Sequence, residues 1–206
     1  AFARLAPYAE LFDVKCGIEI HNPETPQSPA MKEYLDVIKS TGSKYLGFVP
    51  DFGCFAIHPN KPKWDKALEA GVKEEHLQMV AEMRRTGVPQ EEAAKRIMEA
   101  GANPAIMDAL AGMYGYVQFR DESELPRLFD ELKTILPYSF EMHGKFHYLD
   151  ENCVEPSIPY DQIFAFLKEN DFDGYLISEY EDEIGCGGYE FTKRHLAMGK
   201  RLLGLE

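Results

Sequence analysis

The sequence lacks any apolar run long enough to cross a membrane. A membrane-spanning helix needs roughly 18 or more apolar residues in succession, and the apolar stretches of this chain are far shorter. Its first residues also lack the charged segment followed by an apolar one that is typical of a secretory leader. We therefore expect a cytoplasmic protein with no membrane partner.

Positive charge is scarce. The chain has 22 Lys and Arg against 35 Asp and Glu, which gives a formal net charge of −13. Nucleic-acid binding depends on clustered Lys and Arg that release counterions from phosphates. The basic residues near Arg84 and Arg96 are offset by neighbouring acidic ones. We therefore expect no nucleic-acid partner.

Cysteine is also scarce and widely spaced. The four cysteines are Cys16, Cys54, Cys153 and Cys186. Because no two of them form a Cys-x-x-Cys pair, neither a zinc knuckle nor a redox motif is indicated. Reduced thiols in a cytosolic compartment fit this spacing.

Strand-like runs alternate with helical patterns along most of the chain. The runs cover residues 14–21, 45–51, 140–147 and 175–180. Strands that alternate with helices pair in parallel, because the chain crosses back over a helix before each new strand begins. We therefore expect an α/β fold in which the C-terminal ends of the strands lie at one edge.

Residues 63–117 interrupt this alternation. They show several short helical patterns in succession, punctuated by Gly71, Gly87 and Gly101, with no strand between them. This stretch is far longer than the usual few residues of a connection between a strand and a helix. We interpret it as a helical insertion in a single domain that covers residues 1–206.

Ionisable residues stand near the ends of the four predicted strands. The third strand carries His143 and Lys145 two positions apart, so their side chains would share one face. The other strands supply Glu19, Asp51 and Glu179. Because active-site residues of βα barrels gather where the strands end, we expect these side chains to lie together.

Three carboxylates and one imidazole make an oxygen-rich ligand set. Such a set suits Mn²⁺ or Mg²⁺, and also Co²⁺, better than a structural zinc. The ion would polarise a sugar carbonyl or stabilise the enediolate that forms when a carbon acid loses its proton. The sequence therefore predicts a divalent-metal site at the strand ends.

Four segments resemble strand ends of a known superfamily. They are Gly17-Ile-Glu-Ile-His-Asn-Pro23, Val49-Pro-Asp-Phe-Gly53, Met142-His-Gly-Lys-Phe146 and Ile177-Ser-Glu-Tyr-Glu181. These look like the last four strand ends of the xylose isomerase-like TIM barrels, which include sugar and sugar-phosphate isomerases and epimerases. The resemblance implies a TIM (β/α)8 barrel, of which this chain carries the C-terminal four βα units plus the helical insertion. It also implies an oligomer, or association with the missing half-barrel.

The resemblance assigns roles to individual residues. The implied metal ligands are Glu19, Asp51, His143 and Glu179. Mn²⁺ is the expected ion, with Mg²⁺ and Co²⁺ as alternatives. Glu19 and Glu179 would double as the acid/base pair that moves a proton between neighbouring carbons. Lys145 would approach substrate oxygens as a point charge, and His21 stands in the same relation to Glu19. Apart from the resemblance, we expect His58 to contact the substrate from its loop.

Several functions share this set of residues. The first hypothesis is a metal-dependent sugar isomerase or epimerase, which transfers a proton α to a carbonyl of a sugar or sugar phosphate. The position of His21, two residues after Glu19, also resembles the pattern in the catalytic subunits of C-glycoside deglycosidases. These enzymes are lyases that act on 3-oxo-glycosides, and in this second hypothesis His21 would be a base. A non-catalytic fragment or subunit is the third hypothesis. The AP endonuclease family 2-like repair enzymes share the fold, but they need more histidines and a basic groove.

Overall fold

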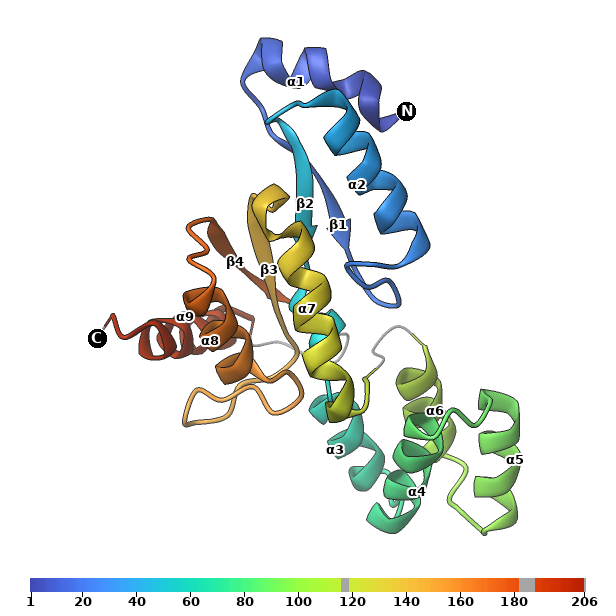
Figure 1. The fold of residues 1–206 in the computed structure, drawn as a ribbon. Coiled ribbons are helices and arrows are strands. Elements are labelled where there is room, and N and C mark those ends of the chain that lie inside the picture. The colour runs from blue at the N-terminus through green and yellow to red at the C-terminus, as the bar shows by residue number, and fades with distance from the viewer. Residues whose placement is uncertain (116–118, 182–187, 206) are drawn as a thin grey trace.

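The structure, a computed structural model, describes residues 1–115, 119–181 and 188–205 (Figure 1). Its strands are β1 (Cys16–Ile20), β2 (Leu46–Pro50), β3 (Glu141–Phe146) and β4 (Tyr175–Tyr180). Its α-helices are α1 (Ala6–Phe12), α2 (Pro29–Thr41), α3 (Lys61–Glu69), α4 (Glu74–Arg85), α5 (Gln90–Glu99), α6 (Ile106–Tyr114), α7 (Leu125–Ile135), α8 (Tyr160–Glu169) and α9 (Gly188–Leu203). Its 3-10 helices are η1 (Phe2–Leu5), η2 (Phe52–Phe55), η3 (Glu122–Glu124) and η4 (Leu136–Tyr138). Cys186 and residues 116–117, the last two of the predicted insertion, lie outside the described ranges.

The strands pair in parallel, as their alternation with helices predicts. β1 pairs with β2 and β3 pairs with β4, each in a parallel register. In these registers Glu19 lies opposite Val49, and Lys145 lies opposite Glu179. The C-terminal ends of the strands within each pair therefore meet at one edge, which places the ionisable residues close to one another.

The prediction of a TIM (β/α)8 barrel, with four of its βα units in this chain, is wrong. The described residues form two separate two-stranded sheets rather than one continuous curved sheet. Between β2 and β3, these residues make two isolated bridges, Phe48 with Ser139 and Asp51 with His143. Alternating apolar and polar residues predict that strands form, but not whether neighbouring strands share a complete ladder. In addition, Pro50 at the end of β2 has no N–H to donate.

Burial distinguishes the inner strands from the outer ones. All five residues of β2 are buried, and so are four of the six residues of β3. In β1 only Ile20 is buried, and β4 has no buried residue; their other residues are exposed or partly buried. The two isolated bridges thus hold the two sheets side by side, with β2 and β3 at the centre (Figure 1).

The helices surround the strands on several sides. Helix α2 contacts β2, and helix α9 contacts β4. Helices α3 to α6 contact one another and form a separate group beyond the strands (Figure 1). Most of the predicted insertion thus consists of these helices, with no strand among its described residues. Within the described ranges, every helix is too short or too polar to cross a membrane.

Helix α2 illustrates how local sequence sets an element beside the strands. Pro29 occupies its first turn, where a missing N–H costs nothing. Met31, Leu35 and Ile38 are buried at helical spacing. Gly42 ends the helix with a φ of +63°, a left-handed conformation that glycine adopts without strain.

A chain of buried polar groups lies behind β3. The Tyr160 hydroxyl donates to the backbone carbonyl of Lys145 at 2.7 Å. Because that bond uses the Tyr160 proton, Nε2–H of His195 donates to the Tyr160 oxygen, at 2.8 Å. Nδ1 of His195 then accepts from the Ser178 hydroxyl at 2.7 Å. This chain assigns a neutral His195, and it ties α8 and α9 to the strand that carries Lys145.

The stability of the fold should depend on pH through His195. Burial lowers the pKa of His195 to about 4 from an ordinary value of 6.5. The unfolded chain therefore takes up a proton at this position before the folded protein does, as the pH falls from 6.5 to 4. The stability that His195 contributes is complete above pH 6.5, and about 3 kcal/mol of it is lost by pH 4. The free energy of unfolding, measured with urea at pH 7 and pH 4.5, should fall less for His195→Gln than for the wild type. Equal losses would contradict this assignment.

Candidate metal and catalytic site

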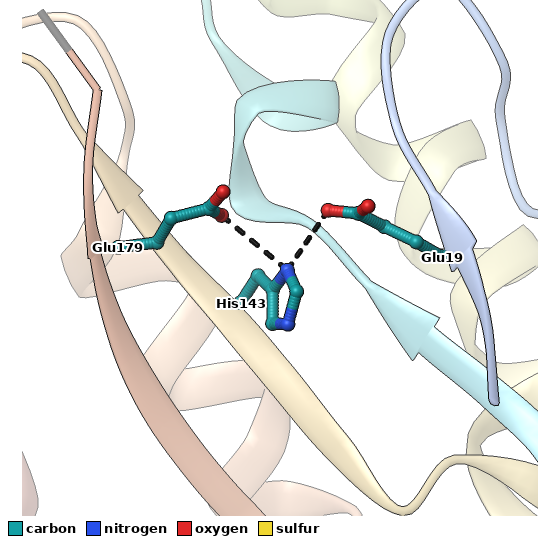
Figure 2. Close-up of side chains that lie close together, drawn as sticks. All are labelled: Glu19, His143 and Glu179. Carbon is teal, nitrogen blue, oxygen red and sulfur yellow. Dashed lines mark hydrogen bonds and ion pairs between the residues drawn. The ribbon is translucent and has the colours of Figure 1, made fainter. Parts of the chain in front are cut away.

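Three of the four predicted metal ligands converge on one point. Glu19 of β1, His143 of β3 and Glu179 of β4 each offer one ligand atom, and these atoms all lie within 4.8 Å of one another. Nδ1 of His143 lies 2.8 Å from Oε1 of Glu19 and 3.4 Å from Oε2 of Glu179. Figure 2 shows this nitrogen pointing between the two carboxylates. We refer to these three residues as the ligand trio.

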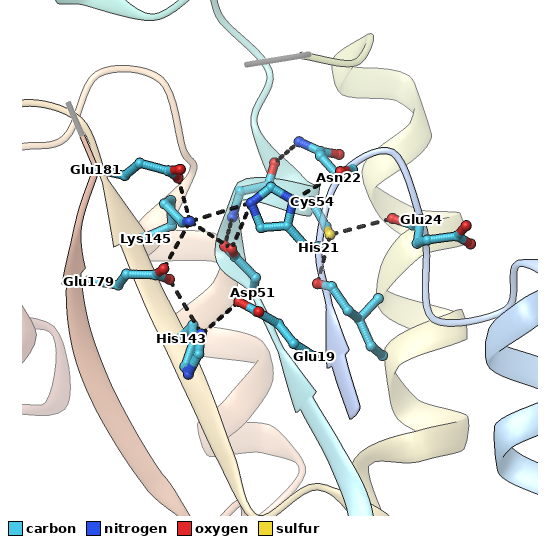
Figure 3. Close-up of polar contacts among 12 residues, drawn as sticks. Glu19, His21, Asn22, Glu24, Asp51, Cys54, His143, Lys145, Glu179 and Glu181 are labelled. Carbon is cyan, nitrogen blue, oxygen red and sulfur yellow. Dashed lines mark hydrogen bonds and ion pairs between the residues drawn. The ribbon is translucent and has the colours of Figure 1, made fainter. Parts of the chain in front are cut away.

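A buried lysine lies next to the ligand trio. Nζ of Lys145 lies 3.0 Å from Oδ2 of Asp51, 3.1 Å from Oε1 of Glu179 and 2.5 Å from Oε2 of Glu181. We call these four residues the lysine cluster (Figure 3). His143 and Lys145 both contact Glu179, so they share one face of β3, as their spacing predicts.

Asp51, the fourth predicted ligand, lies in the lysine cluster rather than with the ligand trio. Its Oδ1 accepts a hydrogen bond from the backbone N–H of Gly53 at 2.6 Å, and its Oδ2 faces Lys145. The Asp51 and Lys145 side chains are only 1% and 2% exposed. A charge pair this deeply buried is costly to break, because either partner alone would be an uncompensated charge.

The surroundings of Lys145 favour its charged form. Burial by itself would lower the pKa of Lys145, but attraction to Asp51 and hydrogen bonds to Glu181 and Asp51 outweigh it and raise this pKa. Counted together, the ligand trio and the lysine cluster hold four carboxylates against one ammonium. The site therefore carries excess negative charge, and a divalent cation would offset it.

His21 lies at the edge of the lysine cluster. Its Nδ1 lies 2.9 Å from the backbone carbonyl oxygen of Asn22, so Nδ1–H donates and a neutral ring carries its lone pair on Nε2. Nε2 lies 3.5 Å from Nζ of Lys145 and 3.7 Å from Oδ2 of Asp51. The basic nitrogen of His21 thus faces the cluster, as Figure 3 shows.

A small polar cavity adjoins His21 and Lys145. Its volume is about 20 Å³, enough for one water molecule or one substrate oxygen. Glu181 and His58 also line this cavity, so His58 lies within reach of the predicted site. Partial burial, together with nearby Arg85, lowers the pKa of His58 and favours its neutral form.

Arg120 and Asn22 hold the loops around the site, and neither residue was predicted to act there. Arg120 donates from Nε to the backbone carbonyl of Cys54 at 3.0 Å and from Nη2 to that of Pro23 at 3.3 Å. Asn22 donates from Nδ2 to the carbonyl of Gly53 at 2.7 Å. No periodic signal marks these residues, because their contacts join segments far apart in the sequence.

Glu181 was also missed as a member of the site. It stands two residues after Glu179, the same spacing that pairs His143 with Lys145. Alternation along the strand was therefore a usable signal for Glu181.

Glu155 is a buried carboxyl group in the loop beside the cavity. Its Oε2 accepts from the backbone N–H groups of Ser157 and Ile158, at 2.7 and 2.5 Å. The Ser157 carbonyl in turn accepts from the N–H groups of Ile57 and His58. Glu155 thereby fixes the loop that places His58. Burial raises the pKa of Glu155 to about 8.

Three comparisons with curated proteins point to one group of enzymes. The chain is 30% identical to a C-glycoside deglycosidase alpha subunit of Arthrobacter globiformis over 179 residues, 86% of this chain and 50% of that protein. It is equally similar, 30% over 185 residues, to a C-glycoside deglycosidase alpha subunit of Microbacterium trichothecenolyticum, again covering 86% and 50%. It is 27% identical over 198 residues to a 3'-dehydrocarminate deglycosidase alpha subunit of a Microbacterium species, covering 86% and 53%. No protein-family model matches the chain.

These similarities favour one of the functional hypotheses over the others. The chain spans about half the length of the curated relatives it matches. All three relatives are named as deglycosidase subunits, which supports the lyase alternative rather than the sugar isomerase or epimerase that we first expected. The broader xylose isomerase-like superfamily is not confirmed.

Replacing Glu155 with Gln should stabilise the protein near pH 8. An ordinary Glu ionises near pH 4.5, whereas folded Glu155 does so near 8. The stability that Glu155 contributes is therefore complete below pH 4.5 and is lost as the pH rises towards 8. Gln keeps an oxygen for Ser157 and Ile158 without the charge, so Glu155→Gln should gain about 2 kcal/mol or more at pH 8. Urea unfolding at pH 5 and pH 8 checks this, and a gain that is the same at both pH values would contradict it.

Proposed function

We propose that this chain is the catalytic part of a C-glycoside deglycosidase alpha subunit, a metal-dependent lyase. It would cleave the carbon–carbon bond between a 3-oxo sugar and its aglycone. Similarity to three deglycosidase subunits supports this proposal over an isomerase. The name of one relative, a 3'-dehydrocarminate deglycosidase alpha subunit, supports an oxidised sugar as the substrate class.

The observation that carries the proposal is the convergence of Glu19, His143 and Glu179 beside His21. Oε2 of Glu179 is buried, and among the described residues it accepts no hydrogen bond. An imidazole nitrogen and two carboxylates within 4.8 Å of one another are ligands that suit Mn²⁺. The residues present therefore fit a divalent ion, for which Mn²⁺ remains our choice over Mg²⁺ or Co²⁺.

The ligand trio would hold this ion. Asp51 would become the fourth ligand once its contact with the Lys145 ammonium is broken. When bound, the ion supplies positive charge that stabilises negative charge developing on the carbonyl oxygen of the substrate. The remaining chemistry belongs to side chains of this chain. It is a proton transfer followed by loss of the aglycone.

His21 is the proposed general base. A sugar with a carbonyl at C3 has an acidic proton at C2, and the aglycone is attached at the next carbon, C1. Nε2 of His21 takes the C2 proton, the electron pair forms a C1–C2 double bond, and the C1–aglycone bond breaks. His21 then returns the proton to the aglycone carbon, which balances the reaction without an oxidant. The hydrogen bond from Nδ1–H to Asn22 keeps Nε2 as the accepting nitrogen.

Lys145 and His58 are the proposed substrate contacts. Both line the small cavity next to His21 and Glu181. An ammonium and a neutral imidazole suit the hydroxyl and carbonyl oxygens of a sugar. Because the relatives are named alpha subunits, we further propose that the active enzyme contains another subunit.

Metal binding should depend on the ligand trio. Equilibrium titration of the full-length, chelator-treated enzyme with Mn²⁺ is expected to give one bound ion. Glu179→Gln and His143→Ala should each weaken that binding by about 100-fold or more, since even outer contacts of metal ligands contribute 10- to 100-fold. Glu151→Gln, a change at an exposed loop residue, serves as the matched control. Stoichiometric Mn²⁺ retained by both ligand variants would exclude this site.

Catalysis should depend on His21 without an equal effect on the metal. His21→Gln is expected to slow cleavage of a 3-oxo C-glycoside by about 10²- to 10⁴-fold, the usual contribution of a general base. Its Mn²⁺ affinity should stay within about threefold of the wild type, because His21 lies outside the ligand trio. His76→Gln, on helix α4, is the control histidine. Product analysis of the assembled enzyme measures the rate, and cleavage by His21→Gln at the wild-type rate would refute the base assignment.

A further inference from the structure

The two oxygens of Glu179 serve two different neighbours. Oε1 lies 3.1 Å from Nζ of Lys145, while Oε2 lies 3.4 Å from Nδ1 of His143 (Figures 2 and 3). One carboxylate therefore belongs both to the ligand trio and to the lysine cluster. A change in the position of Lys145 would therefore also change the position or charge environment of Glu179 in the ligand trio.

Asp51 also faces the lysine. Its Oδ1 is engaged by the Gly53 N–H, which leaves Oδ2 as the oxygen available for a cation. That oxygen already lies 3.0 Å from Nζ of Lys145, in a nearly water-free environment. Because like charges repel strongly where water is excluded, an ammonium and a divalent ion cannot both stay at contact distance from Oδ2 without a large cost.

We propose that Lys145 is an internal competitor for the divalent metal and thereby sets the affinity of the site. Its ammonium occupies Asp51 and one oxygen of Glu179, which are carboxylates that the metal also requires. The inference rests on the metal site of the proposed function. It assigns to Lys145 a role that a simple substrate contact would not have.

The cluster also gives the displaced ammonium a place to go. Oε2 of Glu181 lies 2.5 Å from Nζ of Lys145. Glu181 directly follows β4 and is not part of the ligand trio. Nε2 of His21 lies 3.5 Å from Nζ of Lys145, and His21 lines the small cavity. An ammonium displaced from Asp51 and Glu179 would keep Glu181 as its counter-charge and turn a donor towards this cavity. Metal binding would then prepare Lys145 to donate to a substrate oxygen.

The competition can be measured as metal affinity, without any assay of activity. Lys145→Met removes the charge and keeps most of the side-chain length, while Lys145→Arg keeps the charge. Titration of the chelator-treated, full-length protein with Mn²⁺ should show binding about tenfold tighter or more for Lys145→Met, within the range measured for coupled buried groups. Lys145→Arg should stay within about threefold of the wild type. Lys200→Met, an exposed lysine on α9, is the matched control and should not change.

Each outcome of the titration decides the matter. Tighter binding by Lys145→Met than by the wild type supports the competition, including the case in which the wild type binds too weakly to measure. Equal or weaker binding by Lys145→Met, with normal binding by the wild type, overturns the competition but leaves the metal site standing. If neither protein binds Mn²⁺, both the competition and the metal site are overturned.

A second measurement covers the case in which Lys145→Met does not fold. In wild-type protein labelled with ¹⁵N-lysine, the buried ammonium of Lys145 should give a side-chain NMR signal, assigned by its loss in Lys145→Arg. Saturating Mg²⁺, a diamagnetic ion, should shift this signal as the ammonium leaves Asp51. An unchanged signal while Mg²⁺ is bound would overturn the proposal.

Discussion

The ammonium of Lys145, buried among three carboxylates, is the interaction around which the strand ends are arranged. Asp51 follows β2, and Glu179 and Glu181 lie in β4 and just after it, so one side chain of β3 contacts two neighbouring strand segments. Removing this charge from water is costly unless each partner is well placed. On the other side of β3, the Tyr160 hydroxyl donates a hydrogen bond to the backbone carbonyl of Lys145. Contacts on both sides of β3 therefore hold Lys145 in position.

This constraint explains which parts of the site could be predicted from sequence. Alternation predicted that His143 and Lys145 share one face, and the parallel direction of the strands predicted that Glu19 and Glu179 lie towards the C-terminal ends of β1 and β4. Neither argument distinguishes a carboxylate facing a metal from one facing an ammonium, so the position of Asp51 beside Lys145 was not foreseen. Arg120 shapes the loops through contacts across long sequence separations, which no local pattern records.

The fold was predicted less well than the strands that compose it. Period-two alternation and the intervening helices were sufficient for parallel strands, but they carry no information on how many neighbours each strand has. Between β2 and β3, the described residues pair only through isolated bridges, so two short sheets replace the expected barrel segment. The site residues still meet, because the bridge between Asp51 and His143 places the C-terminal end of β2 beside the middle of β3. Local contact between the end of β2 and the middle of β3, rather than a closed sheet, thus brings the strands that carry the ligand trio together.

The choice between isomerase and lyase illustrates a limit of the residues themselves. Both reactions begin with removal of a proton α to a carbonyl, next to a cation that stabilises the resulting negative charge. Glu19, His143 and Glu179 suit that common step and cannot separate its outcomes. What differs is the group on the neighbouring carbon: if it can depart, the electron pair forms a double bond, and if it cannot, the proton returns to a sugar carbon. In the proposed function, His21, whose Nε2 faces the cluster and lies outside the ligand trio, would be a base that need not also bind the metal. A base free of the metal could carry its proton to a departing carbon, which is consistent with the lyase that the relatives' names favour.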